Sequence, residues 1–306
     1  MQKNIVFMGT PEFAVPTLDA IHKKFGVCAV VTIPDKPKGR GQKLSASPVK
    51  NYAIEKGIEI IQPISMKDLD FAEKLKQINP DIIVVVAFRI LPKEIYSIAN
   101  IASFNIHGSL LPKYRGAAPI NYAILNNEKI SGVTSFILQE KVDTGNILLK
   151  KEIELPNNCT AGDLHDLLMP ISAECAIETI ELLLSGNYTP LKQDDSLASP
   201  APKIFRENCK INFNNSSEYL RCFINHISPI PGAFTIFNDK NLKILRAEIS
   251  NKQISAGNFL IEDDNFYAGT NDSALKLIEI QLEGKNAVKV LDFLRGYRGE
   301  KKGSFN

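Results

Sequence analysis

The chain has 306 residues and a formal net charge of +2, with 44% hydrophobic and 23% charged residues. These proportions are those of an ordinary globular protein, so they exclude global disorder, and the length accommodates two domains. Because the net charge is so small, binding to nucleic acid has to be argued from a local basic cluster rather than from bulk charge.

The five cysteines are widely spaced and odd in number, without a Cys-x-x-Cys pair or a histidine at zinc-finger spacing. We therefore expect reduced, buried thiols and no metal site. The first four residues lead directly into an apolar run instead of a signal peptide, and no uncharged apolar stretch is long enough for a membrane span. The sequence thus predicts a cytoplasmic protein without a membrane partner, with a monomer as the expected state.

Short apolar runs alternate with helical patterns through the first half of the chain. The runs are rich in β-branched residues and cover Ile5–Gly9, Val27–Ile33 and Asp81–Ala87. Helical patterns cover Phe13–Lys24, Pro48–Lys56 and Lys67–Ile78. This alternation predicts an α/β fold with a doubly wound, mostly parallel sheet whose two faces are both covered.

The second half changes in character. A helical pattern runs from Thr160 to Ser185 and contains Pro170, which should kink the helix or split it in two. Pro and Ser then dominate Asn187–Lys203, as in a linker. Short apolar segments follow at Ala233–Phe237, Leu242–Leu245, Asn258–Ile261 and Leu275–Gln281. Their spacing predicts a small β-barrel.

The segment Phe104–Pro112 contains a strand that ends at a glycine, with Asn105 and His107 two residues apart. Residues at this spacing lie on the same face of a strand. At the carboxyl end of a parallel strand, the pair would line the crevice where ligands bind. An isolated Asn-x-His is more often structural, so this pair alone is a weak signal.

Asp143 lies in the tight-turn sequence Asp-Thr-Gly, which by itself is more often a turn than a site. Acyl transfer to an amine needs a proton acceptor, a proton donor for the leaving nitrogen and a donor for the oxyanion. Asn105, His107 and Asp143 are sufficient for these roles. Ser109 has no Gly-x-Ser-x-Gly frame, so direct transfer without a covalent intermediate is favoured.

A third cluster is the loop Pro34–Leu44, with the basic residues Lys36, Lys38, Arg40 and Lys43. It has two glycines and no apolar pattern, so it cannot pack into a core. A loop of this kind often serves only solubility, but clustered Lys and Arg are also what binding to a phosphate backbone requires.

The two segments Asn105–Ile124 and Val142–Leu148, together with Val6–Leu18, resemble the formyltetrahydrofolate-dependent formyltransferases, and within them the branch that acts on methionyl-tRNA. The resemblance implies that Asn105, His107 and Asp143 are catalytic. It also implies that the stretch of Ser109, Leu110, Leu111 and Pro112 lies beside the donor 10-formyltetrahydrofolate, and that the loop with Arg40 enters the acceptor arm of initiator methionyl-tRNA.

The resemblance implies further a Rossmann-like catalytic domain over 1–186, a linker over 187–205 and an OB-like β-barrel domain over 206–306 that supports tRNA. The match is looser in this last part, where Cys209–Phe213 and Ser228–Ala233 carry it. A dinucleotide fingerprint is absent, because Pro11 and Ala14 stand where glycines would be needed after Gly9.

One loop departs from the family pattern. Ala87–Pro92 is one residue shorter than usual and has Arg89 in place of a glycine-containing sequence. In relatives this loop borders the folate pocket. The sequence leaves open whether Arg89 frames the donor or forms a salt bridge at the surface.

Three functions remain: a formyltransferase for methionyl-tRNA, a formyltransferase or formyl hydrolase for a small molecule, and a tRNA-binding protein with a decayed site. The basic loop and second domain favour a tRNA acceptor. The intact Asn105, His107 and Asp143 disfavour a decayed site. Hence we expect N-formylmethionyl-tRNA as product, formed through a tetrahedral intermediate.

Overall fold

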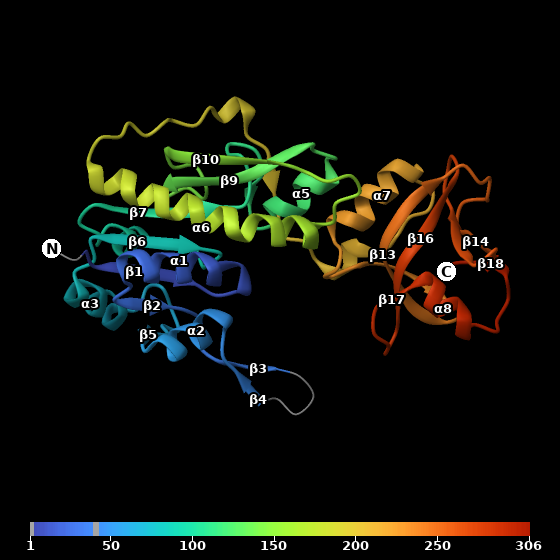
Figure 1. The fold of residues 1–306 in the computed structure, drawn as a ribbon, viewed down its shortest axis with the longest axis horizontal. Helices are drawn as coiled ribbons and strands as arrows, with labels where there is room; N and C mark the ends of the chain where they lie inside the picture. Colours follow the sequence, from blue (N-terminus) through green and yellow to red (C-terminus); the bar gives the residue numbers. More distant parts are fainter. Residues whose placement is uncertain (1–2, 39–42) are drawn as a thin grey trace. The chain divides into compact units, whose positions relative to one another are not determined.

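The computed structural model describes residues 3–38 and 43–306 and divides into two compact units (Figure 1). The first consists of Met1–Pro119, Ile130–Ile153 and His165–Ala201. The second consists of Ile120–Lys129, Glu154–Leu164 and Pro202–Asn306. Each unit therefore combines segments that are far apart in the sequence.

A seven-stranded sheet, in the order β10-β9-β7-β6-β1-β2-β5, forms the centre of the first unit. Its strands are β1 (Ile5–Gly9), β2 (Ala29–Val31), β5 (Glu59–Ile61), β6 (Ile82–Val86), β7 (Ala102–His107), β9 (Ile130–Ile137) and β10 (Ile147–Glu154). The five strands from β7 to β5 are parallel, and β9 is antiparallel to β7. The predicted mostly parallel sheet is confirmed.

Helices cover both faces of this sheet, which explains the uninterrupted apolar strands. The helices are α1 (Val15–Phe25), α2 (Pro48–Lys56), α3 (Leu69–Ile78), α4 (Lys93–Tyr96) and α6 (Ala161–Ser185). Val6 and Met8 of β1 pack in one apolar cluster with Leu75 of α3 and Ile95 of α4. Near the carboxyl end of α6, Thr179 donates a hydrogen bond to Ser135 of β9 at 2.7 Å.

The helical patterns predicted at Pro48–Lys56 and Lys67–Ile78 correspond to α2 and α3. The predicted helix at 13–24 begins instead with a 3-10 turn at Glu12–Ala14, and the second strand is shorter than predicted. Pro170 does not split α6, which is a single helix of 25 residues. The split that the sequence allowed is therefore wrong, because a helix can continue past an internal proline at the loss of one backbone hydrogen bond.

An antiparallel sheet in the order β12-β13-β16-β15-β14-β18 forms the second unit, with β17 beside β16. Its strands are β12 (Ala233–Phe237), β13 (Lys240–Ser250), β14 (Asn258–Glu262), β15 (Asn265–Gly269), β16 (Ala274–Leu282), β17 (Val288–Lys289) and β18 (Lys302–Ser304). Ile236 and Asn306 exchange two backbone hydrogen bonds of 3.1 Å, which joins β12 to the chain after β18. The sheet thus curls as the predicted barrel requires.

Helices α5 (Pro119–Leu125), α7 (Ser217–His226) and α8 (Val290–Gly296) complete the secondary structure around this barrel. Shorter elements are β8 (Arg115–Gly116), β11 (Pro200–Ala201) and 3-10 turns at Asp195–Leu197 and Arg206–Cys209. The predicted linker 187–205 therefore contains local structure, and the domain bounds stay predictions. Among the described residues, no helix combines the length and the apolar character that crossing a membrane demands.

Candidate active site

Strand β7 places Asn105 and His107 at the carboxyl end of the parallel part of the sheet. Asn105 is aligned with Val85 of β6 on one side and Phe136 of β9 on the other. Its side chain is half-buried, and within 3–38 and 43–306 its amide forms no hydrogen bond. That amide is therefore free to donate to a ligand.

The imidazole of His107 is fixed by its surroundings. His107 is 7% exposed, and its Nε2 lies 2.8 Å from the carbonyl oxygen of Tyr114. Because a carbonyl only accepts, Nε2 carries a hydrogen in this arrangement. Phe136 meets the ring edge-on at a centroid distance of 6.5 Å. Nδ1 is thus the ring nitrogen left to act on a substrate.

The carboxylate of Asp143 lies on the Nδ1 side of this ring. Its Oδ2 is 3.7 Å from Nδ1 of His107 and accepts a hydrogen bond from the backbone N–H of Gly116 at 2.8 Å. Asp143 has a φ of 55°, in the left-handed region. The structure therefore brings together His107 and Asp143, which lie 36 positions apart in the sequence.

Two glycines near Asp143 lie too close to neighbouring backbone to carry a side chain. A Cβ on Gly145 would lie 1.7 Å from the carbonyl oxygen of Ile137, so no other residue fits after Asp143 and Thr144. Gly116 has a φ of 124°, and a Cβ there would lie 2.6 Å from the carbonyl oxygen of Ala201. The glycine of Asp-Thr-Gly therefore has a steric reason.

Gln193 supports the Asp143 turn and was missed by the sequence analysis, which placed it in a linker. Its Nε2 donates to the carbonyl oxygens of Asp143 at 2.9 Å and Gly145 at 2.7 Å. Its Oε1 accepts from Arg115 at 2.8 Å, and Arg115 also pairs with Asp195 at 2.7 Å. No local pattern could have identified Gln193, because its partners come from distant segments.

The stretch expected beside the donor is only partly available to a ligand through its side chains. Ser109 is fully buried, and its hydroxyl donates to the carbonyl oxygen of Lys113 at 2.7 Å. Leu111 is also fully buried, in a cluster with Phe136 and Ile147. Leu110 and Pro112 are half-buried.

The basic loop forms a β-hairpin of β3 (Lys36–Lys38) and β4 (Lys43–Ser45), with Lys36 aligned with Ser45. At its base, Asp35 pairs with Lys50 at 2.7 Å and accepts from Gln62 at 3.0 Å. These contacts hold the pKa of Asp35 below its usual value. Arg40 lies outside the described residues, and Lys38 and Lys43 are described by their backbone alone.

Arg89 connects two loops at the carboxyl edge of the sheet. Its guanidinium donates to the carbonyl oxygens of Ile64 at 2.9 Å and Pro63 at 2.8 Å, and lies 5.5 Å from the centre of the Phe88 ring. Burial lowers the pKa of Arg89. No carboxylate pairs with it among the described residues, so the salt bridge that the sequence left open is not formed.

The described residues, which leave out 1–2 and 39–42, hold no group of three or more His, Cys, Asp or Glu side chains suited to a metal ion. The candidate site is therefore built from an amide, an imidazole and a carboxylate. These groups can stabilise an oxyanion, move a proton and orient the ring that moves it.

Two family models match the chain. The formyl transferase model matches residues 3–180, and the model of the formyl transferase C-terminal domain matches residues 203–298. Together they extend over most of both compact units.

Similar proteins align with nearly the whole chain. Methionyl-tRNA formyltransferase of Clostridium tetani (strain Massachusetts / E88) is 44% identical over 303 residues, with 97% of each chain covered. The protein of the same name from Clostridium novyi (strain NT) is 43% identical over 297 residues, with 95% of this chain and 96% of the relative covered.

Among solved structures, an N-formyltransferase from Helicobacter canadensis in complex with folinic acid and dTDP-3-aminofucose is 26% identical, with a TM-score of 0.68. The match covers 90% of this chain and 98% of that one. Methionyl-tRNA formyltransferase from Clostridium thermocellum matches with a TM-score of 0.57 at 23% identity, covering 83% and 96% of the two chains. This second likeness concerns the fold alone.

Proposed function

The chain belongs to the formyl transferase family, and from that premise we propose that it transfers the formyl group of 10-formyltetrahydrofolate to the free α-amine of initiator methionyl-tRNA. The product is N-formylmethionyl-tRNA, used in translation initiation. The observation that carries the proposal is the cluster of Asn105, His107 and Asp143 at the sheet edge. Relatives called methionyl-tRNA formyltransferase align over 95% or more of the chain and support the choice of acceptor.

In the proposed reaction the amine nitrogen bonds to the formyl carbon, and the bond from that carbon to N10 of the donor breaks. Asn105 donates to the formyl oxygen as negative charge develops on it. Nδ1 of His107 takes the proton that the amine loses and returns one to the departing N10, so that protons balance. Asp143, held by the Gly116 N–H, stabilises the positive charge that forms on the ring.

We assign the donor to the crevice beside Ser109–Pro112. Since the Ser109 hydroxyl and the Leu111 side chain are already engaged within the protein, the contacts to the donor fall to the backbone and to Leu110 and Pro112. The loop that contains Arg89 follows β6, the strand next to β7, and is held by the hydrogen bond of Arg89 to Ile64. This loop forms a further wall of the donor crevice. No step of this scheme requires a metal ion.

The basic loop with Lys36, Lys38, Arg40 and Lys43 is proposed to bind the phosphate backbone of the tRNA. Replacing these four residues by Gln should lower tRNA affinity and reduce the dependence of binding on salt, because fewer counterions are released. Filter binding of initiator methionyl-tRNA over a range of salt concentrations measures both quantities. An unchanged salt slope would assign the basic loop a role in solubility alone.

The decisive experiment is incubation of the chain with 10-formyltetrahydrofolate and with either initiator or elongator tRNA charged with methionine. Formyl-methionine is then detected after hydrolysis of the ester. We expect formylation of the initiator tRNA and much less of the elongator. If initiator tRNA gives no product while a free amino sugar nucleotide is formylated, the acceptor is a small molecule.

A further inference from the structure

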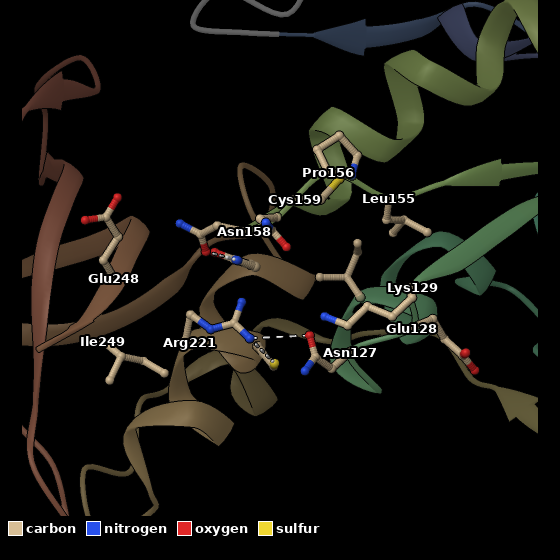
Figure 2. Close-up of a pocket in the computed structure, with 14 residues that line it drawn as sticks. Asn127, Glu128, Lys129, Leu155, Pro156, Asn158, Cys159, Arg221, Glu248 and Ile249 are labelled. Atoms are coloured by element: carbon tan, nitrogen blue, oxygen red, sulfur yellow. Dashed lines mark hydrogen bonds between the residues drawn. The ribbon is translucent and has the colours of Figure 1, made fainter.

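The second unit contains a pocket of about 290 Å³ that the sequence analysis did not identify (Figure 2). It is lined by residues of 124–129, 155–159, α7 and β13, all of which belong to the second unit. None of the residues proposed for formyl transfer lies in its walls. The pocket is therefore separate from the residues proposed for formyl transfer.

Two cations enter this pocket. Figure 2 shows the side chains of Lys129 and Arg221 extending toward its middle from opposite walls. Burial raises the pKa of the Cys222 thiol, Arg221 and Lys129 act to lower it, and the nearby Glu218 acts to raise it. Each cation therefore lies close to the same point of the wall.

Neither of these cations forms an ion pair in the part of the chain that the structure describes. Arg221 donates to the amide oxygen of Asn127 at 3.3 Å, a long contact with a neutral group. Among the described residues, no ion pair joins Lys129 or Arg221 to a carboxylate, although Glu128 and Glu248 also line the pocket. Two cations that face each other and form no ion pair favour a negatively charged ligand.

Asparagine side chains form much of the remaining wall. Asn225 is fully buried and donates to Oδ1 of Asn158 at 2.7 Å, while its own Oδ1 has no hydrogen-bond partner in the described part of the chain. Asn158 in turn donates to the carbonyl oxygen of Ala247 at 3.2 Å. A buried carbonyl without a donor is costly, and a hydroxyl of a ligand would supply one.

We propose that this pocket binds a phosphate ester of nucleotide size, with Lys129 and Arg221 on the phosphate and Oδ1 of Asn225 accepting from a sugar hydroxyl. The volume is at the lower end of small-ligand sites and exceeds what a single phosphate fills. A free nucleotide and one unit of an RNA strand offer the same chemistry. The RNA source rests on the proposed function, since the strand would then be the acceptor tRNA.

Titration calorimetry of the full chain with AMP tests the proposal, with adenosine as the ligand that lacks the phosphate. AMP should bind and adenosine should not. Lys129→Gln and Arg221→Gln should each weaken AMP binding by about tenfold or more, and Arg221→Lys should restore part of it, because contacts to a charged group are the strong ones. Lys240→Gln removes the same charge at an exposed residue outside the pocket, and it should leave AMP binding unchanged.

Absence of AMP binding, or equal binding to wild type, Lys129→Gln and Arg221→Gln, would overturn the proposal. Thermal unfolding of each variant identifies any that fail to fold, and Lys129 is exposed, so its replacement leaves the core intact. If initiator tRNA displaces AMP, the natural ligand of the pocket is a unit of the RNA strand. If AMP stays bound, the natural ligand is a free nucleotide. Because the assay measures binding, a failure of formyl transfer leaves it unaffected.

Discussion

The two compact units hold their central residues by different means. In the first, His107, Asp143 and Gln193 are fixed by hydrogen bonds to backbone groups from other segments. In the second, aromatic rings fill the interior of the barrel, and the ring of Phe237 contacts those of Phe259 and Phe266 at centroid distances of 5.1 and 5.3 Å. Hydrogen bonds set direction, while packing sets stability.

This difference leads to a simple expectation. Changes in the polar cluster of the first unit should lower the rate of catalysis and leave the free energy of unfolding nearly unchanged. Changes among the barrel aromatics should lower the free energy of unfolding and leave the rate per folded molecule unchanged. The first three sets of substitutions below each test one side of that contrast.

The largest effect is expected at the reacting groups. His107→Gln and Asp143→Asn should lower kcat by ~10²- to 10⁴-fold, because each removes part of the proton-transfer machinery. Initial rates of formyl-methionine formation measure this loss, and denaturant unfolding checks that the fold is retained. Near-normal turnover in both variants would discard the proposed mechanism.

Phe266→Ala tests the packed side of the contrast. Phe266 is fully buried and stacks on Phe293 at a centroid distance of 6.2 Å. Its truncation should lower the free energy of unfolding by about 3–5 kcal/mol, from lost burial and the cavity left behind. Leu291→Ala, at a residue that is 46% exposed, is the matched control and should change it by less than about 0.5 kcal/mol. Equal losses in both would contradict a core at Phe266.

Gln193→Ala should lower kcat by about tenfold with little change in KM for methionyl-tRNA, because Gln193 touches no reacting atom and positions the Asp143 turn. Gln193→Glu keeps an acceptor for Arg115 but removes the donor to the carbonyls of Asp143 and Gly145. The kcat of Gln193→Glu should therefore be no higher than that of Gln193→Ala. Lys192→Ala, at the exposed neighbouring residue, serves as control. A change confined to KM would argue against a positioning role.

The smallest expected effect is on the pH dependence of the free energy of unfolding. Burial alone would raise the pKa of Asp163, but hydrogen bonds from Thr160 and the 2.6 Å pair with Arg246 lower it below 3.8 overall. A lowered folded pKa stabilises the fold above the unfolded value, and this contribution is lost as pH falls through the folded value.

Asp163→Asn should thus reduce the free energy of unfolding at neutral pH by about 0.5 kcal/mol or less, since the pair is partly exposed and screened by solvent. The difference from wild type should shrink as the pH falls below 3.8. Urea unfolding at a series of pH values measures it. A difference that persists unchanged in acid would show that the Asp163 charge is not its source.

Much of the fold follows from local patterns. The apolar run Ile5–Gly9 is a strand with the bounds that its composition predicts, and Pro48–Lys56 is a helix with the predicted bounds. Of the two outcomes predicted for Pro170, a kink or a split, the split is wrong, because the other residues of α6 favour the helix and outweigh one lost hydrogen bond. The sequence predicted that the basic loop cannot pack into a core, and the structure adds that its two arms, β3 and β4, pair as antiparallel strands, since strand pairing requires no apolar side chains.

By itself, the sequence determined the alternation of strands and helices, the position of Asn105 and His107 on one strand face and the glycine after Asp143, because these depend on neighbours along the chain. Only the tertiary structure decided which groups meet. The 3.7 Å approach of Asp143 to His107, the support from Gln193, the loop contacts of Arg89 and the pocket between Lys129 and Arg221 all join distant segments. Such contacts arise from packing and long-range hydrogen bonds, which leave no periodic signal in the sequence.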